Sequence, residues 1–152
     1  MARLLVVDDD PVTRQFFADV LARAGDVARC AEDASTGLAL AAIEPFDALL
    51  IDVNLPDGRG EEMLRRLRAN PGAVSRKAIA IATSAELTSA LRRQLRAAGF
   101  ANVLRKPVTA GELDALLAAT VPACAGRSSA ITLAVIADNA PPPLLDDARA
   151  LS

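Results

Sequence analysis

Short apolar runs alternate with amphipathic segments through residues 1–121, and this alternation most constrains the fold. An apolar run bounded by turn residues is typical of a buried strand in a parallel sheet, although its periodicity alone does not exclude a helix. The amphipathic segments predict helices, because their apolar residues recur at helical spacing. The predicted strands are Arg3–Val7, Val27–Ala31, Phe46–Ile51, Ile79–Thr83 and Asn102–Arg105, and the predicted helices are Pro11–Arg23, Ser35–Ile43, Glu61–Ala69, Leu87–Ala98 and Ala110–Val121.

Five strand–helix pairs predict an α/β domain over residues 1–121. Parallel strands need long crossover connections, which are right-handed and place helices on both faces of the sheet. The expected architecture is therefore a doubly wound, five-stranded parallel sheet.

Residues 122–152 differ in character and form an expected C-terminal tail. Two interpretations stay open for it: a disordered, Ala- and Pro-rich extension, or packing of its apolar segment on the domain, on a sheet edge or in a homodimer, since such a segment left bare is prone to aggregate. Its length and residue types are not those of an output domain. Its expected parts are a linker at Pro122–Ser129, an apolar segment at Ile131–Ala137, a break at Pro141–Pro143 and a short helix at Leu144–Leu151.

Composition excludes several kinds of protein. The 152 residues contain no histidine, so a histidine base, a histidine metal ligand and a phosphohistidine within this chain are all excluded. A net charge of −2 argues against a nucleic-acid partner. No apolar run approaches the about 20 residues of a membrane span, and the acidic Asp8–Asp10 follows the first apolar run too closely for a signal peptide. Two cysteines without metal-type spacing fit a reduced compartment, and we expect a cytoplasmic protein.

Polar residues follow four of the predicted strands at the ends that converge in such a sheet: Asp8 and Asp9, Asp52, Ser84, and Lys106. Three neighbouring carboxylates repel one another unless a cation lies between them, and Mg²⁺ suits such oxygen ligands. An ammonium and a hydroxyl beside them would complete a cradle for a phosphoryl group, with Asp52 as the nucleophile. The alternative is a solvated turn in which Asp10 caps the following helix.

Three motifs carry a family resemblance. Val6-Val7-Asp8-Asp9-Asp10-Pro11, Asp52-Val53-Asn54-Leu55-Pro56-Asp57 and Leu104-Arg105-Lys106-Pro107 occur in this order. Together they closely resemble the receiver domain of two-component response regulators, including chemotaxis regulators, over about residues 1–121. The resemblance implies a flavodoxin-like (βα)5 fold with strand order 2-1-3-4-5.

The resemblance also implies roles for individual residues. Asp52 would be the phosphoacceptor, and Asp9 and Asp52 would bind Mg²⁺ together with the backbone carbonyl of Asn54. Asp8 would assist the metal through water, and Lys106 would pair with the phosphoryl oxygens.

The switch hydroxyl of the resemblance falls on Ser84 rather than on Thr83. Ser84 lies 22 positions before Lys106 and 15 before Gly99, which are the separations found in receivers. Only one of two adjacent strand residues can face the site.

Three further positions would modulate the switch. Val103 stands where receivers often carry a Tyr or Phe that reorients on activation, so coupling through a ring is not expected. Asn54 and Glu86 occupy the positions that in receivers flank the line of water attack on the aspartyl phosphate. This pair resembles that of chemotaxis regulators and implies a short-lived phosphoryl group.

The expected function is that of a stand-alone response regulator receiver. A sensor histidine kinase or a phosphotransfer protein of a phosphorelay would supply the phosphoryl group to Asp52 with Mg²⁺, and the change would alter affinity for a target at the surface of the fourth helix, fifth strand and fifth helix. Such a protein is a switch rather than a turnover enzyme, although it can catalyse its own dephosphorylation.

Two alternatives remain. The first is an interaction module that is never phosphorylated, which Val103 and the lack of an output domain keep open. The second is a phosphohydrolase with Asp8 as its nucleophile, which leaves Asp52 and Lys106 without a common explanation. The sequence does not name the kinase, the target, the pathway or the oligomeric state.

Overall fold

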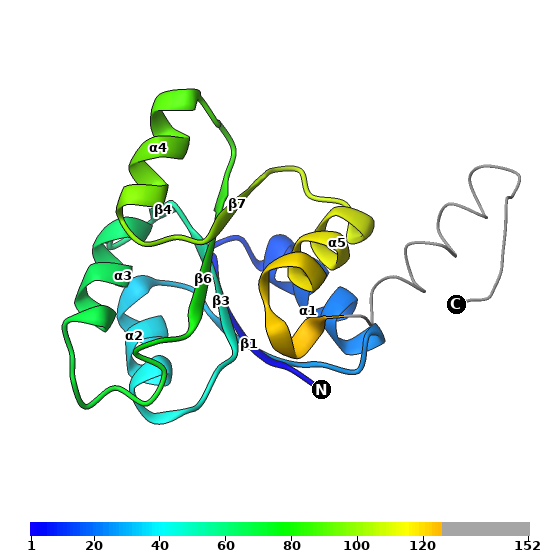
Figure 1. Ribbon diagram of the computed structural model, residues 1–152, viewed down its shortest axis with the longest axis horizontal. Coiled ribbons are helices and arrows are strands. Elements are labelled where there is room, and N and C mark those ends of the chain that lie inside the picture. Colours follow the sequence, from blue (N-terminus) through cyan, green and yellow to red (C-terminus); the bar gives the residue numbers. More distant parts are fainter. Residues whose placement is uncertain (126–152) are drawn as a thin grey trace, which may run out of the picture. The chain divides into compact units, whose positions relative to one another are not determined.

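A five-stranded parallel sheet forms the centre of the first part of the chain (Figure 1). The computed structural model describes residues 1–125. The strands run in the order β2-β1-β3-β6-β7, which is 2-1-3-4-5 once the two short strands β4 and β5 are set aside. This order and the parallel pairing confirm the predicted flavodoxin-like fold. The strands are β1 (Arg3–Val7), β2 (Val27–Ala31), β3 (Ala48–Asp52), β6 (Ile79–Ser84) and β7 (Asn102–Arg105).

The described residues fall into two units, the first of residues 1–107 and the second beginning at residue 108. The first unit holds the sheet and four helices: α1 (Pro11–Arg23), α2 (Ala34–Ile43), α3 (Gly60–Arg68) and α4 (Ser89–Ala97). The second unit begins with α5 (Ala110–Thr120), which starts in a capping box between Thr109 and Glu112. The predictions for the apolar segment, the break and the last helix of the tail lie outside the described residues.

The described part of the chain ends in the segment expected to be a linker. Its first residues form a 3-10 turn, η1 (Pro122–Cys124). Proline suits the first position of such a turn because its missing N–H needs no partner there. The Cys124 N–H then closes the turn by donating to the Val121 carbonyl at 2.8 Å. No helix within residues 1–125 is both long enough and apolar enough to cross a membrane.

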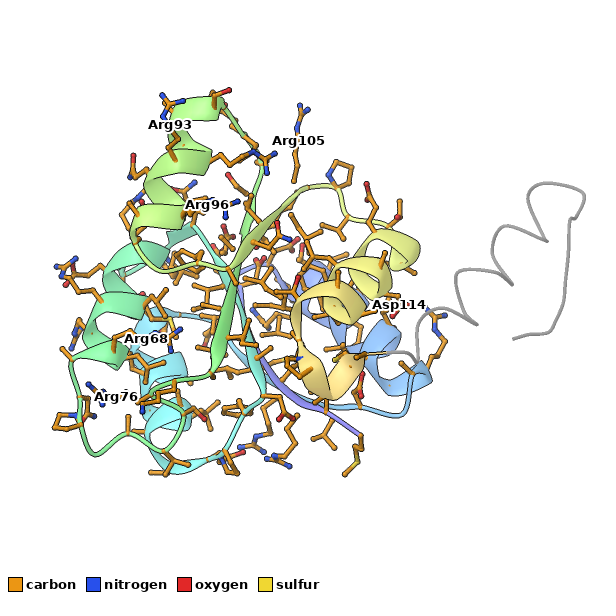
Figure 2. All side chains as sticks on the ribbon, viewed as in Figure 1. Arg68, Arg76, Arg93, Arg96, Arg105 and Asp114 are labelled. Carbon is orange, nitrogen blue, oxygen red and sulfur yellow. The ribbon has the colours of Figure 1, made fainter. Side chains whose placement is uncertain are left out.

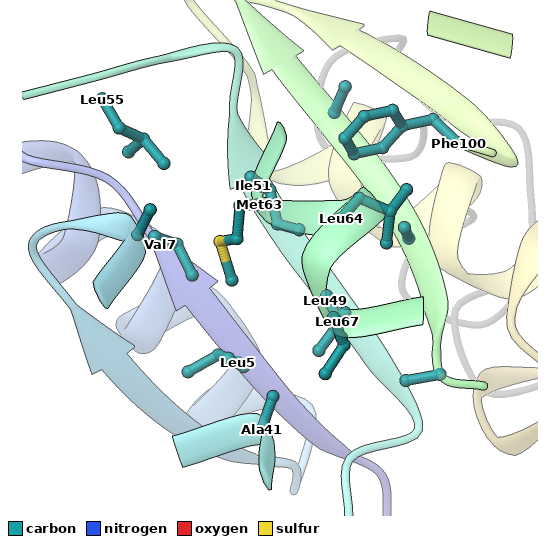
Figure 3. Close-up of a cluster of buried hydrophobic side chains, with 14 of the residues drawn as sticks. Leu5, Val7, Ala41, Leu49, Ile51, Leu55, Met63, Leu64, Leu67 and Phe100 are labelled. Carbon is teal, nitrogen blue, oxygen red and sulfur yellow. The ribbon is translucent and has the colours of Figure 1, made fainter. Parts of the chain in front are cut away.

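Successive strand residues point to opposite faces of the sheet, and helices cover both faces. On one face, α1 lies against β1 and β2 and buries Phe17, Val20 and Leu21. On the other face, side chains of α2, α3 and α4 pack in one apolar cluster with alternate residues of β1 and β3 (Figure 3). The strand members of this cluster include Leu5, Val7, Leu49 and Ile51.

Side-chain caps fix where helices begin. Asp10 accepts a hydrogen bond from the Val12 N–H, and Pro11 occupies the first turn, as the sequence predicts. Thr88 caps α4 by accepting from the Leu91 N–H, so this helix begins at Ser89 and not at the predicted Leu87. Boundaries elsewhere shift by one or two residues, and Asp52 becomes the last residue of β3.

Polar side chains of Ser75 and Arg68 hold the loops at the opposite end of the sheet. Ser75 is 3% exposed; its hydroxyl accepts from the Phe46 N–H at 2.7 Å and donates to the Glu44 carbonyl at 2.5 Å. The Arg68 guanidinium donates to the carbonyls of Arg76 and Ala78, which ties α3 to the loop before β6.

Candidate functional site

The candidate site lies where β1, β3 and β7 end at one edge of the sheet. Asp8 directly follows β1, Asp52 ends β3, and Lys106 directly follows β7. Asp8 is 1% exposed and Asp52 is 7% exposed. The Asp8 N–H donates to the Ala31 carbonyl at 3.0 Å, which extends the β1–β2 ladder and fixes the Asp8 backbone. Parallel topology thus brings together residues that are far apart in sequence.

Lys106 joins the two buried carboxylates. Its Nζ lies 2.7 Å from Asp8 Oδ2 and 2.9 Å from Asp52 Oδ2. The Lys106 N–H donates to the Ser84 carbonyl at 2.8 Å, and the peptide bond between Lys106 and Pro107 is cis. The backbone therefore holds the lysine at the strand end while its side chain reaches both aspartates.

Burial and charge act in opposite directions on these groups. Desolvation raises the pKa of Asp52, and the hydrogen bond from Lys106 opposes this without cancelling it. Burial lowers the pKa of the Lys106 ammonium, but its hydrogen bonds to Asp8 and Asp52 outweigh burial and leave the pKa raised. The ammonium thus stays charged beside the two carboxylates.

The carboxylates fit a hard divalent cation. Oxygen atoms of Asp8, Asp9 and Asp52 all lie within 4.8 Å of one another. Asp8 and Asp52 are buried, whereas Asp9 is exposed, so the cluster opens to solvent on the Asp9 side. The Asp8 Oδ1 accepts from the Asp10 N–H at 2.9 Å, which orients that carboxylate. An all-oxygen, acidic donor set of this kind is typical of Mg²⁺.

A short hairpin of two two-residue strands, which the sequence analysis did not predict, follows Asp52, the candidate phosphoacceptor. Strand β4 (Asn54–Leu55) pairs antiparallel with β5 (Gly58–Arg59). The Asn54 N–H donates to Asp52 Oδ1 at 3.1 Å, and Arg59 Nη1 donates to Asn54 Oδ1 at 3.0 Å. Pro56 and Asp57 form the turn of this acceptor hairpin (residues 54–59), for which Pro-Asp-Gly was the available signal.

Asp57 ties the tip of the acceptor hairpin to α2. Its two carboxylate oxygens accept from the backbone N–H groups of Ala34 at 2.8 Å and Ser35 at 3.0 Å. These hydrogen bonds lower the pKa of Asp57, because they favour its ionised form. Local sequence gives no signal for this contact, since the two segments lie 22 and 23 positions apart.

Gly60 lets the chain pass close to Asp52. A Cβ at Gly60 would lie 2.6 Å from the Asp52 carbonyl oxygen and 3.1 Å from Ile51 Cγ2. The Gly60 N–H donates to the Val53 carbonyl at 2.9 Å, which closes the acceptor hairpin at its base. The sequence alone does not predict this close approach.

The switch positions lie on neighbouring strands. Ser84 is 2% exposed, and its hydroxyl donates to the Glu86 carbonyl at 2.5 Å, which holds the loop after β6. Thr83, which pairs with Asp52 across the sheet, is also buried. Val103 is buried within the apolar cluster. Within residues 1–125 the Ser84 hydroxyl thus bonds to the loop rather than to Asp52 or Lys106.

Comparison with known proteins shows which family has this arrangement of residues. Residues 4–118 match the model of the response regulator receiver domain. The sensory/regulatory protein RpfC of Xanthomonas campestris pv. campestris is 33% identical over 111 residues, which cover 73% of this chain and 15% of that protein. The chain therefore spans a small part of this relative.

Solved structures show the same architecture. The chemotaxis protein CheY4 of Vibrio cholerae superposes with a TM-score of 0.74 and 27% identity, covering 80% of this chain and 99% of that one. The receiver domain of the Pseudomonas aeruginosa sensor histidine kinase PA1611 superposes with a TM-score of 0.71 and 26% identity, covering 80% and 98%. That structure has a magnesium ion coordinated in its active-site cleft.

Proposed function

Because this chain belongs to the response regulator receiver domain family of two-component signalling, we propose that Asp52 accepts a phosphoryl group from a phosphohistidine on a partner protein. The observation that carries the proposal is the Lys106 ammonium, which contacts both Asp8 and Asp52 at the ends of their strands. The donor is a sensor histidine kinase or a phosphotransfer protein. The 152 residues contain no histidine, so the phosphohistidine lies outside them.

In the transfer, a carboxylate oxygen of Asp52 attacks phosphorus. The O–P bond forms as the N–P bond of the donor breaks, and the donor imidazole keeps the electron pair and takes a proton from solvent. Lys106 neutralises charge on the phosphoryl oxygens, because its ammonium has three N–H donors and contacts two carboxylate oxygens. Asp52 suits the acceptor role better than Asp8, because Asp8 is almost fully enclosed.

Asp8, Asp9, Asp52 and the backbone carbonyl of Asn54 would hold Mg²⁺. Three carboxylate groups within 4.8 Å of one another fit such an ion. When bound, the ion supplies positive charge that offsets the charge on the carboxylates and the incoming phosphoryl oxygens. Asp8 and Lys106 then remain as the groups of the chain that orient the acceptor.

Ser84 and Lys106 would transmit the change. The Ser84 hydroxyl now holds the Glu86 carbonyl, so a phosphoryl oxygen that recruits this hydroxyl would release the loop between β6 and α4. Partner binding would follow on α4 and β7, where Arg93, Arg96 and Arg105 are exposed (Figure 2). The receiver comprises residues 1–121 in this proposal, and Asn54 and Glu86 set the lifetime of its phosphoryl group.

Phosphorylation with a small donor tests the proposal. The protein is incubated with acetyl phosphate or phosphoramidate and Mg²⁺, and its intact mass is measured. We expect the mass of one phosphoryl group to be added, and we expect none on Asp52→Asn or with a chelator. An unmodified wild-type protein would favour the interaction module, whereas an adduct that persists in Asp52→Asn and disappears in Asp8→Asn would favour the phosphohydrolase.

A further inference from the structure

The backbone and the side chain of Asn54 have different partners. Its backbone N–H contacts Asp52 Oδ1, while its side-chain carbonyl accepts from Arg59 Nη1 at 3.0 Å. Asn54 and Arg59 are also directly opposite each other in the acceptor hairpin. The orientation of the Asn54 side chain therefore depends on where the Arg59 guanidinium is held.

Glu61 holds that guanidinium. Arg59 Nη2 lies 3.2 Å from Glu61 Oε2, and the Glu61 side chain is only 13% exposed. Glu61 lies in the first turn of α3, where the N-terminal end of the helix dipole favours a carboxylate. An ion pair with one partner fixed in this way loses less side-chain freedom than a pair between two exposed chains.

The same oxygen of Glu61 also binds α4. Gln94 Nε2 donates to Glu61 Oε2 at 2.6 Å, across a separation of 33 residues. The other oxygen, Oε1, is buried and accepts no hydrogen bond from residues 1–125. Arg59 and Gln94 thus share one acceptor atom, and a displacement of either changes the contact of the other.

We propose that Arg59, Glu61 and Gln94 form a polar relay through which the position of α4 sets the orientation of the Asn54 side chain beside Asp52. Arg59 and Glu61 act as positioning residues, and Gln94 connects Glu61 to α4. The relay rests on the proposed function in one respect: its output is the lifetime of the phosphoryl group on Asp52. By linkage, a partner that moves Gln94 away from Glu61 alters that lifetime.

The direction of the effect follows from the side-chain oxygen of Asn54, Oδ1. While Arg59 donates to it, this oxygen is a poorer acceptor for the hydrogen of an attacking water. When Arg59 no longer donates to it, Oδ1 can orient water toward phosphorus. The water oxygen then forms the new O–P bond, the bond to Asp52 breaks with its electron pair left on the carboxylate, and phosphate leaves with one hydrogen of the water while the other passes to solvent. Breaking the relay should therefore speed hydrolysis.

Four single variants test the relay. Glu61→Ala and Gln94→Ala break it. Glu62→Ala and Arg92→Ala are matched controls, because Glu62 pairs with Arg65 on the same helix and Arg92 is an exposed residue of α4 two positions before Gln94. After phosphorylation and removal of the donor, intact mass gives the decay rate of the adduct. We expect about threefold faster decay in both relay variants, the size that loss of one partly exposed ion pair gives, and no change in the controls.

A second readout needs no phosphorylation. The side-chain amide resonances of Asn54 are compared by NMR in the unmodified wild type and variants. They should shift in Glu61→Ala and Gln94→Ala and stay unchanged in both controls. Unshifted Asn54 resonances in Gln94→Ala would overturn the relay, and so would equal decay rates in all variants. Absence of any adduct on wild type would instead count against the proposed function, while the NMR comparison still decides the relay.

Discussion

Lys106 Nζ lies 2.9 Å from Asp52 Oδ2, so the carboxylate proposed to accept the phosphoryl group already has a cationic partner. The same ammonium lies 2.7 Å from Asp8 Oδ2. A metal ion that approaches these two carboxylates must therefore compete with a charge built into the chain.

Lys106→Met should raise the affinity for Mg²⁺ while slowing phosphorylation. Without the ammonium, the negative charge on Asp8 and Asp52 is left for the metal, and we expect the Kd for Mg²⁺ to fall by about threefold to tenfold. The chain has neither Trp nor Tyr, so calorimetric titration is the suitable measurement. Arg105→Met, which removes the neighbouring exposed cation, is the control and should leave the Kd nearly unchanged. An unaltered Kd in Lys106→Met would contradict the competition.

Gly60→Ala should destabilise the protein. Its Cβ would lie 2.6 Å from the carbonyl oxygen of Asp52, which cannot move without disturbing β3. We expect the free energy of unfolding to fall by about 1–3 kcal/mol, measured by urea denaturation followed by circular dichroism. Gly111→Ala is the matched control, since nothing lies within 4 Å of its Cβ and alanine favours a helix. Equal stabilities of the two variants would show that the Asp52 backbone yields easily.

Asp57→Asn should remove a pH-dependent part of the stability. The pKa of Asp57 is lowered in the folded protein, chiefly by the N–H groups of Ala34 and Ser35. Its ionised form therefore stabilises the fold above the unfolded pKa, and this contribution is lost as pH falls through the lower, folded pKa. Urea midpoints of wild type and variant should differ most near pH 7 and converge below about pH 4. A constant difference at all pH values would mean that charge at Asp57 is unimportant.

Ser75→Ala should weaken the fold at the end of the sheet opposite the candidate site. The variant leaves the buried Phe46 N–H without its 2.7 Å acceptor and the Glu44 carbonyl without its donor. Loss of partners for buried groups costs about 1–3 kcal/mol. Ser89→Ala, at an exposed position in the first turn of α4, is the control. The urea midpoints should separate the two variants, and identical midpoints would mean that water replaces the Ser75 hydroxyl.

The sequence was sufficient for the parts of the fold that depend on local pattern. Short apolar runs bounded by turn residues predicted the five main strands, and Asp10 with Pro11 predicted the start of α1. The convergence of Asp8, Asp52 and Lys106 followed from parallel topology, because strand ends of the same sense meet at one edge.

The contacts that the sequence did not predict join segments that have no shared local pattern. Asp57 reaches α2, Ser75 reaches the loop before β3, and Gln94 reaches Glu61. In each of these contacts the partner is determined by tertiary packing and not by a fixed separation in the sequence. The hairpin at Asn54–Arg59 was missed for another reason: two-residue strands are too short for an alternation to be seen.

The hydrogen bond between Lys106 and Asp8 spans 98 positions of the chain. Because β7 is connected to β1 through β6 and β3, the two charged groups meet where the whole sheet is assembled. The proposed acceptor site is thus a property of the folded chain: an unfolded copy would carry the same aspartate without the lysine beside it.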